Sequence, residues 1–450
     1  MTERYRSYSE AADSGVRWLG AIPAHWEVIQ SRRLFEQRKE RMRPGDEQLT
    51  ASQKYGVIPQ SEFMQLEDQK VMQVFTGADI LKHVEPNDFV ISMRSFQGGL
   101  EWCGHSGCVS SAYVGITPAK HVQAGFFKYL FKSSPYIQAL QSTSNLVRDG
   151  QALRFQNFAQ VPLPLIPASE QTQIAKFLDY ETAKIDALIE KQQQLIALLK
   201  EKRQAVISHA VTKGLNPDAP MRDSGVEWLG EVPAHWEVMA IKRLVSVPVT
   251  DGPHETPRFI DDGVPFLSAE GVSSGVVDFS RVRGFISEAL DAEYSKKYTP
   301  KKHDIFMVKS GATTGVTAIV ETDRHFNIWS PLAVVRCNAH TDPHFTHFFL
   351  RSRNFQEAVE LSWSFGTQQN IGMRVIENLH VARPPLDEAR RIVVHLTNMS
   401  GKMDAISKKA EGQVQLLQER RTALISAAVT GKIDVRNWKA PESNPEAEVA

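Results

Sequence analysis

The 450-residue sequence lacks the features that would indicate secretion, membrane insertion or a charge-driven function. Its three cysteines, Cys103, Cys108 and Cys337, fit reduced thiols better than a disulfide framework. No apolar run approaches the roughly 18 residues of a membrane span, and the N-terminus has no apolar signal-peptide core. Basic and acidic residues number 52 each, whereas free-standing nucleic-acid binders usually carry a basic excess. We expect a folded cytoplasmic protein, and composition does not indicate its function.

Signatures of enzymes that act on nucleic acids are also missing. Gly431-Lys432 is not followed by Ser or Thr and has no glycine five residues before it, so there is no phosphate-binding loop. Pro384-Pro385 lies between arginine and leucine, unlike the Asp/Asn-Pro-Pro-aromatic tetrapeptide of amino-methyltransferases. Asp68-Gln69-Lys70 lacks the upstream Pro-Asp of a nuclease site, and no G-x-S-x-G nucleophile motif occurs. We predict no catalytic residue in this chain.

Two groups of residues have a spacing that metal ligands could use. Cys103, His105 and Cys108 lie close in sequence, but a zinc site needs three or four ligands and usually a second pair elsewhere. His344 and His347 lie one turn apart in a predicted helix that also contains several phenylalanines. We interpret the first group as a reduced structural loop and the second as packing and surface residues, so we predict no bound metal.

Comparison of the chain with itself reveals two duplications. Residues 13–28, DSGVRWLGAIPAHWEV, match residues 223–238, DSGVEWLGEVPAHWEV, at 13 of 16 positions. Residues 170–216 align more loosely with 388–434, and there LLKEKRQAVISHAVT faces LLQERRTALISAAVT. Such repeats indicate architecture before any secondary structure is assigned. The chain therefore has the plan block, helix, block, helix.

Each longer duplicate predicts a long helix with one apolar stripe, because apolar residues recur at steps of three, four and seven. Ser169 is the expected N-cap and Gly214 the expected stop of the first helix, whereas Gly401 and Gly412 predict a break in the second. We expect the two helices to cover each other's stripes as an intramolecular coiled coil. The predicted packing residues are Ile185, Leu188, Leu199, Val206, Met403, Ile406, Leu417 and Leu424.

The blocks between the helices combine short β-rich runs, a late helical stretch and a proline-rich end, so each predicts a mixed α/β globule. The expected fold is α+β: two mixed α/β domains separated by two long antiparallel helices, with a pseudo-two-fold internal repeat. The short duplicates 13–28 and 223–238 are called joints. The expected segments are a first joint and domain (1–160), a helical spacer (161–215), a second joint and domain (216–385), a second spacer (386–435) and a disordered tail (436–450).

The ordered set of motifs resembles the specificity subunit of type I restriction-modification enzymes over nearly the full length. The set comprises the motif WLG-x-[IV]-PAHWEV, which occurs twice, and the E-Q-x-x-I helix start at Glu170. It also comprises the L-x-E-[KR]-R-x-A-[VL]-I-S-x-A-V-T motif on both helices and four short motifs within the blocks. These short motifs are Asp251-Gly252-Pro253-His254, Ser310 to Gly315, Met93 to Gly99 and Ser110 to Tyr113. Glu388-Ala389 departs from the usual Glu-Gln, and Pro253 stands where Thr is frequent.

The resemblance implies a non-catalytic chain with two target-recognition domains, each reading half of a split double-stranded DNA site, and with helices that fix their spacing. It implies two modification subunits, which methylate adenine with S-adenosylmethionine, and restriction subunits, which use ATP and Mg. No cofactor is then expected on this chain. Residues 32–154 hold 15 basic and 12 acidic side chains, and residues 240–385 hold 16 of each. We therefore predict weak, salt-sensitive DNA binding by the chain alone and tight binding in the complex.

Polar side chains in turn-rich stretches are the candidates for base readout, since Arg pairs with guanine and Asn or Gln with adenine. They are Arg94, Gln97, Arg148, Gln151 and Arg154 in the first block and Lys309, Thr313, Thr314, Gln368, Gln369, Asn370 and Arg374 in the second. The alternative for each is a solvated loop residue.

The duplicated joints are the candidates for partner docking, because two near-identical segments can each bind one copy of the same partner. Their anchoring residues are Trp18, Pro23, Trp26, Trp228, Pro233 and Trp236. We interpret the tryptophans as structural anchors rather than as DNA-stacking residues, since they lie outside the variable blocks. Two other functions stay open: a structural adaptor that joins partner proteins through its helices without DNA, and a self-sufficient nuclease or methyltransferase with an unrecognised site.

Overall fold

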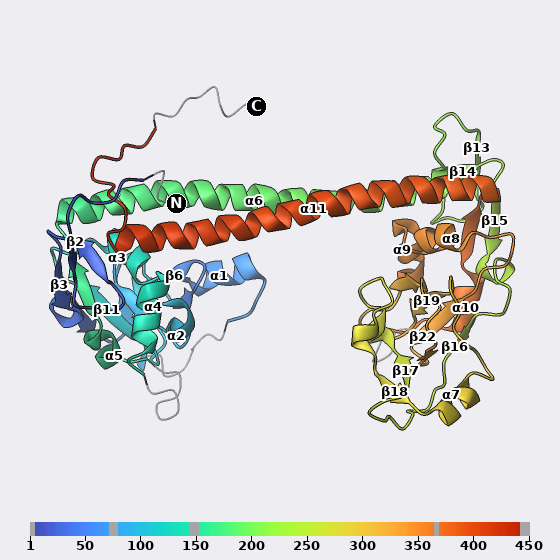
Figure 1. Ribbon diagram of the computed structural model, residues 1–450, viewed down its shortest axis with the longest axis horizontal. Helices are drawn as coiled ribbons and strands as arrows, with labels where there is room; N and C mark the ends of the chain where they lie inside the picture. Colours follow the sequence, from blue (N-terminus) through green and yellow to red (C-terminus); the bar gives the residue numbers. More distant parts are fainter. Residues whose placement is uncertain (1–4, 72–79, 145–152, 364–368, 442–450) are drawn as a thin grey trace. The chain divides into compact units, whose positions relative to one another are not determined.

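The computed structural model describes residues 5–71, 80–144, 153–363 and 369–441. It divides into two compact units, each built from its own stretches of chain (Figure 1). Unit 1 comprises Met1–Gln192 and Gly412–Ala450, and unit 2 comprises Gln193–Glu411. Each unit contains one α/β domain and a part of both long helices, so the compact units do not follow the five successive segments expected from the sequence.

The domain of unit 1 is built on a four-stranded antiparallel sheet in the order β4, β11, β8, β9. These strands are Phe35–Arg38, Val114–Pro118, Phe89–Ile91 and Glu101–Trp102. Three helices supply aromatic residues to the same core: α3 (Ala124–Leu130), α4 (Ser134–Gln141) and α5 (Phe155–Gln160). Phe35 and Phe89 of the sheet pack on Phe131, with ring centroids 5.3 and 4.9 Å away. Burial of these rings contributes favourably to the domain's stability.

Smaller elements surround this sheet. Two hairpins pair β1 (Ala11–Asp13) with β2 (Ala21–Pro23) and β5 (Leu49–Ser52) with β6 (Gly56–Pro59). Strands β7 (Lys82–Val84) and β10 (Gly107–Val109), which are not consecutive in the chain, form a further antiparallel pair. Helices α1 (Gln60–Glu67) and α2 (Ser95–Gly98) are short. Strand β3 (Glu27–Gln30) pairs with β12 (Pro162–Leu165), which joins the duplicated joint to the proline-rich end of the block.

The domain of unit 2 repeats this plan with different residues. Its four-stranded antiparallel sheet has the order β16, β22, β19, β20, which are Thr250–Asp251, Leu332–Val335, Ile305–Val308 and Thr317–Ile319. Its helices are α7 (Glu288–Tyr294), α8 (Pro343–Leu350), α9 (Arg353–Leu361) and α10 (Met373–Asn378). The joint again forms a hairpin, β13 (Met221–Asp223) with β14 (Glu231–Pro233), and β15 (Glu237–Ala240) again pairs with the end of the block, β23 (His380–Arg383).

One extra sheet distinguishes unit 2. Strand β17 (Val264–Leu267) pairs antiparallel with β18 (Gly284–Ile286) and parallel with β21 (Asn327–Ile328). The two domains therefore share the topology of the main sheet, as the internal repeat predicts, and differ in what is added around it.

The long helices are α6 (Ala168–Lys213) and α11 (Leu386–Val429), and they run antiparallel in both units (Figure 1). In unit 1 Arg421 donates two hydrogen bonds to the carboxylate of Asp186, at 2.8 and 3.2 Å. In unit 2 Arg203 makes the matching ion pair with Asp404. The duplication aligns Asp186 with Asp404 and Arg203 with Arg421. The repeated sequence therefore forms the same cross-helix ion pair once in each unit. In unit 1 α6 supplies the aspartate and α11 the arginine, and in unit 2 α11 supplies the aspartate and α6 the arginine.

The buried seam of each helix is narrower than the apolar stripe of the sequence. Ile185, Met403 and Leu424 are buried, and Leu199, Val206 and Leu417 are half-buried. Leu188 and Ile406 differ from the expectation, because they are 42% and 45% exposed. A two-helix pair buries residues at alternating steps of three and four, and these two equivalent positions lie beside that series rather than in it.

The helix ends and the tail correct three further expectations. Helix α11 is unbroken, because Gly401 and Gly412 are both exposed and glycine only lowers helix stability there. Helix α6 begins at Ala168, so Ser169 lies in its first turn, and it ends as predicted before Gly214, whose φ is 76°. The segment expected to be a disordered tail from residue 436 is packed at least as far as Trp438, whose ring centroid lies 5.3 Å from that of Phe177.

Among the described residues, no helix is both long enough and apolar enough to cross a membrane.

Candidate nucleic-acid interface

The loop that follows the central strand of unit 2 connects β19 to β20 and holds three of the predicted DNA-reading residues, Lys309, Thr313 and Thr314. Its shape is fixed by the backbone: Gly311 N–H donates to the carbonyl of Gln369 at 3.1 Å, and Ile371 N–H donates to the carbonyl of Lys309 at 2.8 Å. Gly311 and Gly315 have φ values of 101° and 94°, a region that side chains disfavour. The loop and the segment before α10 thus form one backbone-paired surface.

Two of the predicted residues in this loop are engaged inside the protein. The Lys309 side chain is only 13% exposed, and its Nζ lies 3.1 Å from Oδ2 of buried Asp251. Thr314 is buried, and its hydroxyl donates to the carbonyl of Gly311 at 2.7 Å. Both side chains stabilise the loop and are not available to contact DNA bases.

The other candidates of unit 2 remain accessible. Gln369, Asn370 and Arg374 are exposed, and Thr313 is half-buried. Arg374 lies in the first turn of α10, next to the segment that pairs with the loop. Gln368 lies outside the described residues.

The first domain places a different loop at the same point of the topology, between β8 and β9. Arg94 and Gln97 are exposed there, whereas buried Ser95 holds the turn by accepting from Ser92 N–H at 2.8 Å. Gln53 donates to the carbonyl of Arg94 at 3.3 Å. Arg154 is exposed at the start of α5, and Arg148 and Gln151 lie outside the described residues.

The opposite end of each central strand carries a buried aspartate paired with arginine. Arg38 donates to both carboxylate oxygens of Asp88 at 2.5 and 3.2 Å, in unit 1. Arg336 does the same to Asp304 at 2.6 and 2.7 Å, in unit 2. Both aspartates also accept a backbone N–H from three residues earlier. This shared element fixes the start of the strand whose other end presents the loop.

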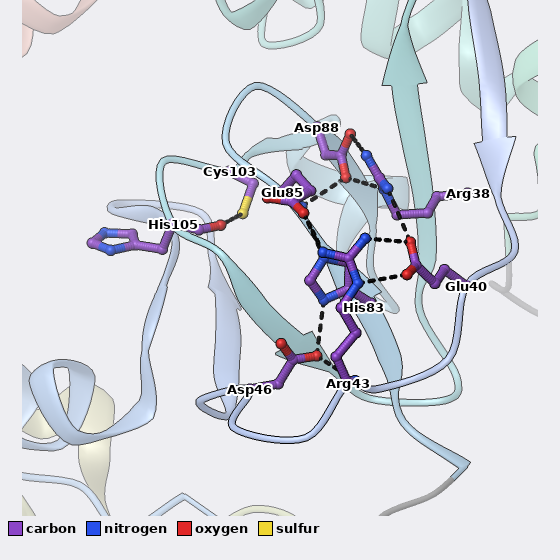
Figure 2. Close-up of polar contacts among 9 residues, drawn as sticks. All are labelled: Arg38, Glu40, Arg43, Asp46, His83, Glu85, Asp88, Cys103 and His105. Atoms are coloured by element: carbon purple, nitrogen blue, oxygen red, sulfur yellow. Dashed lines mark hydrogen bonds and ion pairs between the residues drawn. The ribbon is translucent and has the colours of Figure 1, made fainter.

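In unit 1 the aspartate belongs to a larger charged network around His83, which Figure 2 shows. The His83 ring is 1% exposed and lies 2.8 Å from both Asp46 and Glu85. Burial lowers the pKa of His83, but hydrogen bonds to Glu85 and Asp46 outweigh it and raise the pKa above its ordinary value. Arg43 bridges Glu40 and Glu85 at 2.5 and 2.7 Å. The carboxylates are all paired with cations, so the network holds the hairpins together instead of forming an acid–base site.

Each joint is anchored by a glutamate, a role that was not predicted from the sequence. In unit 1 Trp26 Nε1–H donates to Glu170 at 3.1 Å, and His25 Nε2 lies 2.7 Å from the other oxygen. In unit 2 Glu388 holds its own tryptophan and histidine in the same way, at 3.2 and 2.7 Å. The signal was available, because both glutamates open the duplicated helices and both His-Trp pairs end the duplicated joints.

The other joint residues pack inside their own units. Pro23, Trp26, Pro233 and Trp236 are buried, and Trp18 and Trp228 are half-buried. Trp18 Nε1–H donates to the carbonyl of Pro162 at 3.2 Å, and the Trp228 ring packs edge-on against Phe355 at 6.1 Å. These contacts agree with anchoring of the joint.

Neither of the two sequence groups considered as metal ligands forms a ligand cluster by itself among the described residues. Cys103 and Cys108 are buried, and burial raises the pKa of both thiols to about 11, which disfavours the thiolate that metals bind. Burial also lowers the pKa of His347 to about 4, and its Nε2 lies 3.4 Å from the Thr317 carbonyl, so it packs as a neutral ring. His344 points elsewhere, toward Glu321.

Comparison with known proteins agrees with this architecture. Residues 23–198 match the family described as type I restriction modification DNA specificity domain. The Type I restriction enzyme EcoBI specificity subunit of Escherichia coli is 24% identical over 81% of this chain and 76% of its own length. The EcoKI specificity subunit of Escherichia coli strain K12 is 24% identical over 83% and 80%.

A solved chain shares the fold, with a TM-score of 0.68, 15% identity, and coverage of 92% of this chain and 99% of its own. That chain comes from work on complex assembly and conformational transition of the type I R-M system. The family match covers the first domain and part of α6, whereas the matches to the two relatives and to the solved chain cover at least 81% of this chain. Over most of its length the chain is therefore similar to type I restriction-modification specificity subunits.

Proposed function

We propose that this chain recognises an asymmetric, two-part site in double-stranded DNA, with each domain reading one half. The observation that carries the proposal is that two sheets of the same topology each present a polar loop at the same point, after the central strand, with unlike residues in the two loops. Because the two loops occupy equivalent positions, we expect both domains to recognise DNA in the same way. Unlike side chains suit two different half-sites.

The exposed side chains have the chemistry of base readout. Arg94 and Gln97 in unit 1, and Gln369 and Arg374 in unit 2, are exposed and belong to the types that pair with guanine and adenine in the major groove. Neither domain has a strong basic excess. Much of the phosphate neutralisation would then come from partner subunits, so the chain alone should bind DNA weakly and lose that binding as salt rises.

The partners of this proposal are two modification subunits and the restriction subunits. The two joints share 13 of 16 residues and the same Glu-His-Trp anchor, which suits two copies of one modification subunit. S-adenosylmethionine, ATP and Mg would be bound by those partners, and the complex would act in the cytoplasm, where its DNA is. The two long helices would set the spacing between the half-sites.

The test is a map of methylated adenines in host DNA, made with the wild-type gene, without the gene, and with domain-specific variants. Arg94→Ala with Gln97→Ala should relax or abolish one half of a bipartite motif, and Gln369→Ala with Arg374→Ala should affect the other half. Each lost bidentate contact should cost about 1–3 kcal/mol of discrimination against the wrong base.

Matched controls remove an exposed lysine from each domain: Lys120→Ala in unit 1 and Lys296→Ala in unit 2. Lys120 follows β11 at the end of the sheet opposite Arg94. Both controls should leave the motif unchanged. If deletion of the gene leaves the methylation map unchanged and the assembled complex protects no duplex, the chain is a structural adaptor and the proposal is wrong.

A further inference from the structure

Three possible metal ligands meet in unit 2, away from the loops described above. The side chains of His303, Glu321 and His344 place their ligand atoms within 4.8 Å of one another. His303 and Glu321 are exposed and His344 is half-buried, so water and ions reach all three. It is the only cluster of this kind found within the described parts of the chain.

The fold brings these residues together for reasons visible in the strand register. Ile305 pairs with Ile319 in the β19–β20 hairpin, and the ladder continues outward because His303 N–H donates to the carbonyl of Val320 at 2.7 Å. His303 therefore lies opposite Val320, just beyond the hairpin, and Glu321 is the next residue along the partner strand. His344 reaches the same point from the first turn of α8.

We propose that His303, Glu321 and His344 form a surface site for a divalent transition metal, with zinc as the natural occupant. Two imidazoles and one carboxylate are a donor set that zinc uses, with water in the remaining position. Nδ1 of His344 lies 3.4 Å from Oε1 of Glu321, which is too long for a good hydrogen bond. It equals the separation, about 3.4 Å, of two tetrahedral ligands that are each about 2.1 Å from one zinc ion.

The ring of His303 also lies against that of His344, with centroids 5.2 Å apart. A small rotation of the exposed His303 side chain would bring one of its ring nitrogens to the ion held by His344 and Glu321. A bound ion would then join the base of the β19–β20 hairpin to α8 and stabilise unit 2. No such cluster is present at the equivalent point of unit 1, within its described residues, where Asn87 precedes the buried aspartate in place of His303.

Because Asn87 of unit 1 occupies the position equivalent to His303, replacing His303 by asparagine removes one proposed metal ligand and should not disturb the fold. Both Asn87 and His303 have positive φ, at 74° and 69°, and asparagine is among the residues that accept this conformation. His303→Asn thus removes the imidazole without a backbone penalty and copies the residue of unit 1. His344→Ala removes a second ligand at a helical position, where alanine is favourable.

The experiment titrates the full chain, without a polyhistidine tag and after removal of metals by chelation, with Zn²⁺ in a calorimeter and with Co²⁺ followed by visible absorption. Wild type should bind one equivalent of Zn²⁺. Bound Co²⁺ should give a spectrum of nitrogen and oxygen ligands without thiolate charge transfer. Zn²⁺ should also raise the melting temperature of the chain.

Each ligand variant should weaken Zn²⁺ binding at least about 100-fold, since even outer-shell changes cost about 10- to 100-fold. Both should lose the zinc-dependent rise in melting temperature while keeping the wild-type circular dichroism. His380→Ala, which removes an exposed histidine outside the cluster in the same unit, should bind as wild type does. Absence of a Zn²⁺ equivalent in wild type, or undiminished binding by His303→Asn and His344→Ala, would overturn the proposal.

Discussion

Replacement of Asp304 by asparagine should destabilise unit 2 while leaving unit 1 folded. The Asp304 carboxylate is 0% exposed and accepts two hydrogen bonds from Arg336, one from Lys301 N–H and one from the Tyr298 hydroxyl. Asparagine keeps the shape but removes the charge, and its amide cannot accept on both sides. The Arg336 guanidinium, which is 20% exposed, then loses its counter-ion.

The magnitude follows from this geometry. Breaking a buried ion pair by removing one partner costs roughly 3–5 kcal/mol. Arg336 keeps its hydrogen bond to the carbonyl of Thr299 at 2.7 Å and some contact with water, so we expect the low end, about 3 kcal/mol. For a domain of this size, each kcal/mol lowers the melting temperature by roughly 2–4 °C, which predicts a fall of about 6–12 °C.

Hydrogen exchange followed by mass spectrometry can locate the effect. Peptides from β19 and β22 should lose protection in Asp304→Asn, whereas those from β8 and β11 should keep it. Asp88→Asn is the matched variant, because Asp88 holds Arg38 in the same way, and it should show the reverse pattern. Equal loss of protection in both units, or a change in unfolding free energy below about 0.5 kcal/mol, would refute the reasoning.

Three further predictions concern single residues. The folded-state pKa of His83 is raised, so its contribution to stability is full below the unfolded value near 6.5 and is lost as pH rises through the folded pKa. His83→Gln should therefore flatten the decline in unit 1 protection that sets in above about pH 6.5, and an unchanged slope would contradict this. Ile185→Ala should lower the unfolding free energy by about 2–5 kcal/mol in urea, whereas exposed Leu188→Ala should cost well under 1.5 kcal/mol, and equal costs would contradict the seam. Gly214→Ala, at φ 76°, should cost about 1–2 kcal/mol, which thermal unfolding can measure against the control Ala205→Gly at an exposed helical site.

The sequence predicted the molecule well where it repeats itself. Two near-copies of a joint and of an amphipathic helix predicted two domains of one plan and an antiparallel helix pair, because a long apolar stripe needs a matching cover. The exchanged ion pairs Asp186–Arg421 and Asp404–Arg203 follow directly from that repeat. The helix stop at Gly214 followed from local chemistry, because glycine accepts positive φ.

The tertiary structure decided everything that depends on which side chains meet across distant segments. Spacing marked Lys309 and Thr314 as surface candidates, and only the fold brings Asp251 and Gln369 to them.

Periodicity placed Leu188 on the helix stripe, but the seam that the partner helix covers is narrower. His303, Glu321 and His344 are unremarkable in sequence, and hairpin register with helix docking makes them neighbours. Local patterns and repeats depend on residues that are close together in the sequence. Burial, ion pairing and ligand geometry depend on residues that are distant in sequence and that come together only in the folded protein.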